Sequence, residues 1–402
     1  MSKTINKRNK FLPFHKPSIE DEEISEVIDT LKSGWITTGP KTKLFEEKFR
    51  EYVGSRYAIA VSSCTAGLHL GLVAAGIGQG DEVITTPYTF AATGEVIIQV
   101  GAKPIFVDVE KHSLNIDPEE IRKAVTPNTK AIIPVHFAGQ PCRMAEIIKI
   151  AREHNLIIIE DAAHALAAEY NSEKIGNVGD ITVFSFYATK NMTTGEGGMV
   201  TTNNSEFEKK IRLLSLHGLS RDAWKRYMNE GSWYYEIIDS GYKYNMSDIQ
   251  AAIGLHQLSK LDRLQKVREK YVQMYNDGFK DISEIMVPPQ AENSKHAWHL
   301  YVIQLNLDLI NVNRSKVISE LSECNIGTSV HFIPLHLHPF YRDKFAFNSG
   351  FPNAEHAYER VISLPIYPAM SSEDVQYVIE SVKRIIISHR KYQGGMEYET
   401  SV

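Results

Sequence analysis

The segment from Thr182 to Thr201 (TVFSFYATKNMTTGEGGMVT) places a lysine where it can do chemistry. Its opening alternation of apolar and polar residues predicts a half-buried strand. Lys190 follows in a polar, glycine-rich turn, before a second short strand from Met199. A desolvated lysine amine is a useful nucleophile, and its typical covalent role is a Schiff base with a carbonyl. The ordinary alternative is a solvated lysine in a surface hairpin.

A carboxylate, Asp161, follows the apolar run Leu156–Ile159 in the segment NLIIIEDAAHALAAEY. That run predicts a buried strand of a parallel sheet, and ligands of open α/β sheets bind beyond the carboxyl ends of the strands. An aspartate there can face the pyridinium nitrogen of pyridoxal phosphate, which also needs a lysine. Alone, Asp161 would serve equally well as a helix N-cap. Paired with Lys190, it favours the cofactor.

Composition excludes several classes of protein. The 402-residue chain is 43% hydrophobic, which is ordinary for a globular protein. A net charge of −5 gives no electrostatic case for nucleic acid, and the absence of an apolar run of about 18 residues predicts no membrane span. The three cysteines are too few for a disulfide framework, so we expect a cytoplasmic protein.

The elements that must position the lysine and the carboxylate alternate between strand and helix. Short apolar strands are predicted at residues 57–61, 81–86, 103–109, 130–135 and 156–159, with helical stretches between them. This order is typical of βαβ units. An earlier helix, Ser18–Lys32, carries Ile19, Ile24, Val27, Ile28 and Leu31 along one face.

The pattern of charged and apolar residues changes after Leu258. Lys260–Phe279 predicts a long charged helix that bridges to a small antiparallel α+β unit with strands at 299–307 and 327–333. We therefore predict an α/β domain over residues 11–258, a smaller α+β domain over 259–390, and flexible termini at 1–10 and 391–402.

Three segments together, IIIEDAAHA, SFYATKNMTTGEGG and GYKYNMSDIQAAIGLHQL, resemble the DegT/DnrJ/EryC1/StrS family of pyridoxal-phosphate sugar aminotransferases. The similarity runs from about Phe11 to Lys383. It implies the type I fold of these transferases, with a mostly parallel seven-stranded sheet. FLPFHKPSI, SGWITTGPKT and HAWHLYVI are most similar to members that aminate C4 of a UDP- or dTDP-linked 4-keto-6-deoxy sugar or 4-keto pentose, with glutamate as the expected donor.

The resemblance also implies which residues bind the cofactor. Lys190 would carry it, and Asp161 would hold the ring nitrogen. His164 would lie near the ring hydroxyl, Phe90 against one ring face, and the phosphate would meet the side chains of Thr65 and Ser185, the backbone of Ala66, and Asn245 of the other subunit. The family is therefore expected to form a homodimer with shared active sites. From the residues alone, Thr65 caps a helix equally well and Phe90 is more often core.

Substrate contacts are expected from three further segments. The SGWITTGPKT loop contains Thr38, the GYKYN loop contains Tyr244, and HFIPLHLHPFYR contains His331 and His336. Arg221 and Arg226 suit a nucleotide diphosphate, although they fit a solvated face equally well. The histidines lack acidic or cysteine partners at a metal-binding spacing, so no metal is predicted.

Several alternatives remain open at this stage. Amination at C3, sugar dehydration on the same fold, a class I aldolase and a non-catalytic regulator that binds the sugar nucleotide are the other hypotheses. Family members that dehydrate carry histidine at the lysine position, so Lys190 favours amination. An aldolase would not explain a phosphate-binding helix start, and a regulator would need neither Lys190 nor Asp161.

Overall fold

A computed structural model describes residues 7–220, 234–345 and 350–391 of the chain. Its centre is a seven-stranded sheet in the order β1-β9-β8-β5-β4-β2-β3. The strands are β1 (Tyr57–Val61), β2 (Glu82–Thr85), β3 (Lys103–Phe106), β4 (Thr129–Ile133), β5 (Ile157–Asp161), β8 (Ile181–Ser185) and β9 (Gly198–Thr202). Strand β9 runs in the direction opposite to the other six, and it pairs antiparallel with β1 and β8. The predicted mostly parallel sheet is confirmed.

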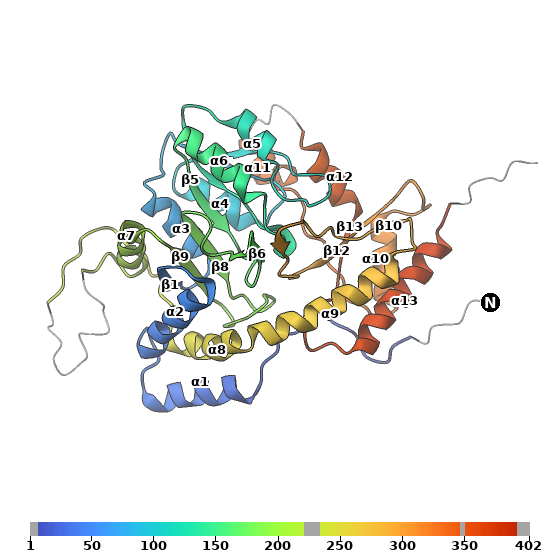
Figure 1. Ribbon diagram of the computed structural model, residues 1–402, viewed down its shortest axis with the longest axis horizontal. Helices are drawn as coiled ribbons and strands as arrows, with labels where there is room; N and C mark the ends of the chain where they lie inside the picture. Colours follow the sequence, from blue (N-terminus) through green and yellow to red (C-terminus); the bar gives the residue numbers. More distant parts are fainter. Residues whose placement is uncertain (1–6, 221–233, 346–349, 392–402) are drawn as a thin grey trace, which may run out of the picture.

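Helices cover both faces of this sheet because its strands are apolar on both sides. The surrounding helices are α1 (Asp21–Ser33), α2 (Pro40–Val53), α3 (Cys64–Ala74), α4 (Ala91–Gln99), α5 (Pro118–Ala124), α6 (Met144–His154), α7 (Ser205–Ser215) and α8 (Asp248–Ser259). Residues on opposite faces of one strand, such as Ile181 and Phe184, belong to different hydrophobic clusters on the two sides of the sheet. Helices α3, α4 and α7 pack on one face, and α2 and α8 on the other (Figure 1).

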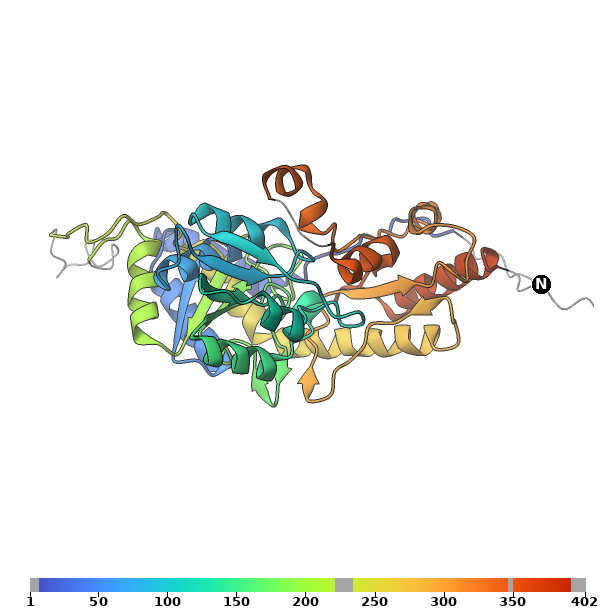
Figure 2. The same ribbon diagram turned by 90° about the horizontal axis from the view of Figure 1, so that it is seen from above.

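The C-terminal part is joined to the sheet by one long helix, α9 (Leu261–Phe279), which extends from the end of α8 along the length of the molecule (Figures 1 and 2). Beyond it lies an antiparallel sheet of β10 (Ile285–Met286), β12 (Tyr301–Leu305) and β13 (Val361–Leu364). Helices α10 (Arg314–Glu323), α11 (Pro339–Lys344), α12 (Pro352–Arg360) and α13 (Ser372–Ser388) accompany it. A third small sheet joins β6 (Glu169–Tyr170), β7 (Glu173–Lys174) and β11 (Ser294–Lys295).

One predicted strand, residues 327–333, is wrong. The segment pairs with β13 only at Ser329, which exchanges two backbone hydrogen bonds with Ser363. The next residues, Val330, His331 and Phe332, instead turn their side chains toward a cavity. Apolar alternation cannot distinguish a strand that packs on a core from an extended segment that lines a site.

The apolar face of α1 points away from the protein. Ile24, Ile28 and Leu31 are 51%, 46% and 54% exposed, whereas Glu23 and Thr30 are buried against the rest of the chain. Helix α1 packs on α8 at the edge of the molecule (Figure 1). Its buried side is held by polar contacts, among them the ion pair of Glu23 with Lys260 at 2.6 Å. The helix therefore presents its apolar stripe to something outside this chain.

The N-terminal segment crosses to the C-terminal part before α1 begins. Leu12 pairs with Ile326 and is buried, and Arg8 forms an ion pair with Asp374 on α13. Residues 8–10 were expected to fray, yet Arg8 is hydrogen-bonded there. The start of the described chain is accordingly attached to α13.

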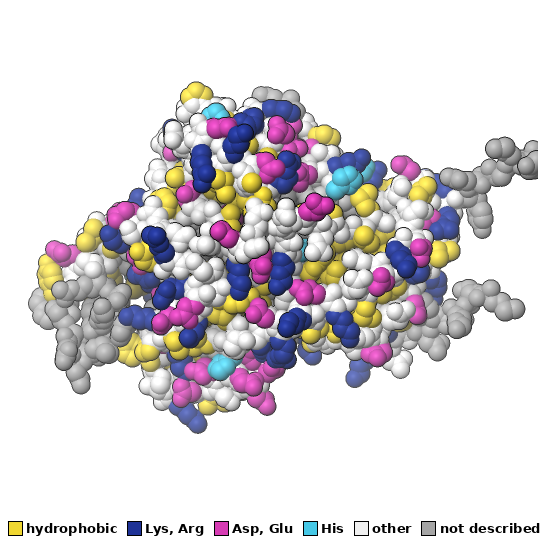
Figure 3. Space-filling view, viewed as in Figure 1, with side chains coloured by type: hydrophobic (Ala, Val, Ile, Leu, Met, Phe, Trp, Pro, Cys, Tyr) yellow, Lys and Arg dark blue, Asp and Glu magenta, His cyan; other side chains and the backbone are white. Residues whose placement is uncertain are grey.

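The surface of the described residues is mixed in charge. Lysine and arginine alternate with aspartate and glutamate over the face shown in Figure 3, and no described helix is long and apolar enough to cross a bilayer. The cysteines Cys64, Cys142 and Cys324 form no disulfide. The predicted cytoplasmic location stays a prediction.

Candidate active site

A cavity of about 610 Å³ lies where the carboxyl ends of β5 and β8 meet the C-terminal part of the chain. This edge is where open α/β sheets bind ligands. Of the residues expected to bind cofactor or substrate, the cavity walls contain Thr65, Phe90, Asp161, His164, Ser185, Lys190 and His331. These residues come from five separate segments of the sequence, and the fold brings them together.

Asp161, the last residue of β5, is 6% exposed and is held on both oxygens. Oδ2 accepts a hydrogen bond from the Thr93 hydroxyl at 2.7 Å, and Oδ1 accepts one from the Ala163 backbone N–H at 3.1 Å. Burial raises the pKa of the carboxyl, and these two hydrogen bonds oppose the rise. A carboxylate removed from water in this way is stabilised by a positively charged partner.

Lys190 lies in the turn that follows β8, and it is half-buried because it faces the cavity. Burial lowers the pKa of its amine to about 8, despite the opposing influence of Cys64 and Asp161. A substantial fraction of the amine is therefore neutral near physiological pH, which is the form that attacks a carbonyl. The alternative of a solvated surface lysine does not fit this position.

The N-terminus of α3 forms another wall. Ser63 caps the helix by accepting the Ala66 backbone N–H at 3.0 Å, and Ser63, Thr65 and Ser185 all line the cavity. A Cβ added at Gly198 would lie 2.7 and 2.8 Å from the backbone of Ser63 and Cys64, so only glycine allows β9 to pass this close. Hydroxyls beside a helix N-terminus suit a phosphate. Ala66 itself is buried, and its N–H is occupied by the cap.

Histidines form the side of the cavity opposite the sheet. The rings of His164 and His299 are 4.4 Å apart, and His164 accepts the Ala138 backbone N–H at 3.3 Å. His331 stacks on Phe14 at 5.6 Å and bonds Ser363 at 2.8 Å. Burial lowers the pKa of all three, that of His331 to about 4, so these imidazoles are neutral at pH 7.

Phe90 is 64% exposed at the mouth of the cavity, near Phe332 at 6.4 Å between ring centroids. The alternative that it is a core residue is therefore wrong. Its position leaves a flat aromatic face available to a ligand ring.

Thr38, Asn245 and Tyr244 form a separate group that is not part of these walls. Asn245 donates from Nδ2 to the Thr38 hydroxyl at 2.7 Å, and Tyr244 stacks on Tyr242 at 5.0 Å. In the resemblance Asn245 serves the other subunit's site, and a location outside its own cavity is compatible with that.

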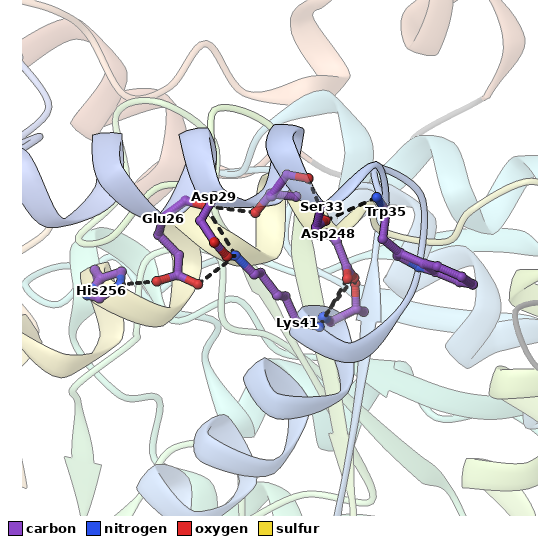
Figure 4. Close-up of polar contacts among 9 residues, drawn as sticks. Glu26, Asp29, Ser33, Trp35, Lys41, Asp248 and His256 are labelled. Carbon is purple, nitrogen blue, oxygen red and sulfur yellow. Dashed lines mark hydrogen bonds and ion pairs between the residues drawn. The ribbon is translucent and has the colours of Figure 1, made fainter. Parts of the chain in front are cut away.

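The segment carrying Thr38 is fixed by Asp248, the first residue of α8, which the sequence analysis did not single out. Its carboxylate is 1% exposed and accepts the backbone N–H groups of Gly39, Lys41 and Thr42 at 2.7, 3.0 and 2.9 Å, and the Thr42 hydroxyl at 2.6 Å. Figure 4 shows Lys41 reaching from this turn toward Glu26 and Asp29 of α1. The same Glu26 meets His256 of α8 at 3.1 Å.

Of the predicted substrate contacts that the structure describes, His331 lines the cavity, whereas Thr38, Tyr244 and His336 do not. His336 is 8% exposed, bonds Glu355 at 3.0 Å and packs on Phe351, so its prediction as a substrate contact is not supported by the geometry. Burial behind α12 explains this. Arg221 and Arg226 lie outside the described residues. No group of three or more metal-ligating side chains is found in the described ranges.

Comparison with known proteins decides the family. The profile of the DegT/DnrJ/EryC1/StrS aminotransferase family matches residues 17–383. The chain belongs to this family. Among its relatives, the Methanocaldococcus jannaschii protein MJ1066 is 62% identical, and the Bacillus subtilis spore coat polysaccharide biosynthesis protein SpsC is 53% identical. Each alignment covers 95% of this chain and 99% or more of the relative.

Solved structures agree. The putative sugar aminotransferase Spr1654 from Streptococcus pneumoniae, in its PMP form, superimposes with a TM-score of 0.88 at 35% identity, covering 94% of this chain and 99% of that one. Its PLP form gives 0.87. The chain is thus a pyridoxal-phosphate-dependent sugar aminotransferase with the type I fold.

The residues of this aminotransferase fit the cofactor. A buried carboxylate that needs a positive partner, an amine with a lowered pKa, and hydroxyls at a helix N-terminus match a pyridinium, an aldehyde and a phosphate respectively. Asp161, Lys190 and the Ser63–Thr65 end of α3 would hold these three groups.

Several cavity residues of the aminotransferase escaped the sequence analysis. Thr93, His15 and His299 touch the site or its aspartate. Each lies far from Asp161 and Lys190 in the sequence and has no distinctive spacing. HKPSI and HAWHL resembled the family, but nothing in them indicated which side chain faces the site.

Proposed function

We propose that this aminotransferase transfers the amino group of glutamate to the C4 keto carbon of a UDP- or dTDP-linked keto sugar. The site's pairing of Lys190 with Asp161 in one cavity supports the transfer of an amine. The preference for C4 follows from the segments FLPFHKPSI, SGWITTGPKT and HAWHLYVI, which resemble enzymes of that specificity. The name of SpsC suggests that the product serves a cell-surface polysaccharide.

Each residue has one task in this proposal. The bound cofactor supplies an electron sink for the carbon that gains or loses the amine. Lys190 Nζ takes the proton from the donor carbon that loses the amine and, in the second half of the reaction, delivers a proton to the sugar carbon that gains it, a role that suits a pKa near 8. Asp161 keeps a positive charge beside its carboxylate, and Thr93 fixes the orientation of that carboxylate. The neutral histidines can bond sugar hydroxyls without repelling the amine.

A homodimer with shared active sites is part of the proposal. The apolar stripe of Ile24, Ile28 and Leu31 is exposed, as are Ile36 and Leu44 nearby in sequence. Contiguous apolar surface of this kind marks an interaction site. Asn245, turned away from its own cavity, would contribute to that of the second copy.

The decisive experiment replaces Lys190 with alanine. Turnover of glutamate and keto-sugar nucleotides should be lost, while circular dichroism and the melting temperature show a folded protein. A panel of UDP- and dTDP-linked 4-keto and 3-keto sugars, assayed with the unaltered enzyme, identifies the substrate. An active Lys190→Ala enzyme without added amine would refute the proposal.

A further inference from the structure

Arg268 on α9 is a buried cation that has no counterion among the described residues. It is 1% exposed, and Nη1 donates to the backbone oxygens of Trp298 at 3.2 Å and Ile366 at 2.8 Å. Nε is buried and has no hydrogen-bond partner. Within residues 7–220, 234–345 and 350–391, no carboxylate lies within ion-pair distance of this guanidinium.

Its position is directly behind the wall of the cavity. One carbonyl that it binds belongs to Ile366, which lines the cavity, and the other belongs to the residue before His299, which also lines it. The guanidinium also acts electrostatically on His15 and His299. It therefore lies next to three wall residues that come from three different segments of the chain.

His15 is the wall residue with spare hydrogen-bonding capacity. Its Nε2 is buried and without a partner among the described residues, and its ring lies 5.7 Å from that of Tyr367. It reaches the cavity from the N-terminal segment, next to Phe14. A buried imidazole nitrogen and a buried cation, which contact the neighbouring residues Tyr367 and Ile366 and are both incompletely bonded among the described residues, are costly unless a ligand completes them.

The cavity also needs a positive charge for its substrates. Lys190 is the only lysine or arginine in the described walls, and the reaction uses it. An amino-acid donor brings at least one carboxylate. Burial lowers the pKa of Arg268 to about 10, so the guanidinium still carries its charge at neutral pH.

We propose that Arg268 and His15 form the subsite for a carboxylate of the amino-acid donor. His15 forms the part of the wall that the carboxylate meets, and Arg268 supplies the compensating charge behind it. This inference rests on the proposed amino-acid donor. It makes the pair a determinant of donor choice, separate from the recognition of the sugar.

The test compares donor kinetics in Arg268→Met and His15→Phe with a matched control, Arg263→Met. Arg263 lies on the same helix, is exposed and pairs with Glu20. Arg268→Met should raise KM for glutamate about 10-fold, because the charge that compensates the carboxylate is lost, with KM for the sugar nucleotide unchanged. His15→Phe should raise it less, and Arg263→Met should not change it. Arg268→Lys keeps the charge and should recover part of the loss.

Two donor analogues identify which carboxylate is bound. Glutamine lacks the side-chain carboxylate, and γ-aminobutyrate lacks the α-carboxylate. Arg268→Met should abolish the preference for glutamate over whichever analogue lacks the group that Arg268 recognises.

Calorimetry with glutarate, a dicarboxylate without an amine, gives a readout that needs no turnover. Cofactor-loaded unaltered enzyme should bind it, and folded Arg268→Met should not. Unchanged glutamate KM in a folded, cofactor-loaded Arg268→Met, or a rise confined to the sugar nucleotide, would overturn the subsite. If Arg268→Met fails to fold, Arg268→Lys and His15→Phe carry the test, and glutarate binding and glutamate KM unchanged in both would overturn the subsite. Failure to aminate any sugar, with glutarate still bound, would count against the proposed function only.

Discussion

Asp248 and Arg268 are buried to the same extent on consecutive helices, yet their surroundings differ. Asp248 accepts four hydrogen bonds from Gly39 and the first turn of α2, and each of these contacts lies within the chain. Arg268 bonds two carbonyls through one nitrogen and leaves Nε unpaired. A buried charge that is fully bonded organises the fold, whereas one that is incompletely bonded beside a cavity awaits a ligand.

Asp161 belongs between these two cases. Both of its oxygens accept hydrogen bonds, but burial still raises its pKa. Two neutral donors do not compensate a buried negative charge as a cation does. The carboxylate is thus fixed in place while its charge remains uncompensated, as the partner of a pyridinium requires.

Among the variants that test this comparison of buried charges, Asp161→Asn is expected to have the largest effect. The shape and the contact with Thr93 can persist, but the negative charge is gone, and kcat should fall roughly 10²- to 10³-fold, as for other lost preorganised charges. Steady-state assays with glutamate and the keto-sugar nucleotide measure this.

The control for Asp161→Asn is Asp180→Asn, which changes an aspartate that bonds the Ile158 backbone N–H at the opposite end of the sheet. It should leave kcat within a few-fold of the unaltered enzyme. Equal losses from both variants would mean that charge beside the cofactor is not the cause.

A smaller effect, on stability rather than catalysis, is expected for Asp248→Ala. Its removal leaves the donors of residues 39, 41 and 42 without their acceptor, and the free energy of unfolding should fall by about 3 kcal/mol. Urea denaturation followed by circular dichroism gives the value.

Asp29→Ala is the matched comparison for Asp248→Ala. Asp29 contacts the same turn through Lys41, but its side chain is 71% exposed. Exposed ion pairs contribute little, so a change within about 0.5 kcal/mol is expected. A similar loss from both variants would show that burial does not separate these carboxylates.

The smallest effect concerns pH. The pKa of Lys190 is lowered to about 8 from an ordinary 10.5, so between these values the unfolded chain holds more protons than the folded one. Stability of the cofactor-free protein should therefore rise with pH across this window, relative to Lys190→Met. Denaturation at pH 7.5 and 9.5 measures the difference. If the difference in stability between the unaltered protein and Lys190→Met is the same at both pH values, the Lys190 amine is exposed to water and its pKa is not lowered.

The sequence predicted the parts of the site that are local. Lys190 and Asp161 each follow a short apolar strand, and strand ends of a parallel sheet converge. Arg268 could not be recognised in the same way because its partners lie 30 and 98 residues further along the chain. Asp248, whose partners lie more than 200 residues earlier, escaped for the same reason.

The periodicity of apolar residues located the helices and strands more reliably than it showed what their apolar faces pack against. Helix α1 has the apolar stripe expected from its sequence, but Glu23 faces the chain and Ile24 faces outward. Residues 327–333 have the alternation of a strand but line the cavity. In both cases a pattern of apolar residues indicates a surface to be covered, and it does not say by what.

The walls of the cavity are drawn from Phe14 at one end of the chain to Ile366 near the other. During synthesis, a ribosome must therefore release nearly the whole polypeptide before the site is closed on all sides. The enzyme can therefore bind its cofactor in a closed site only after nearly the whole chain has been synthesised. A protein truncated before β13 would lose the site even though its central sheet was complete.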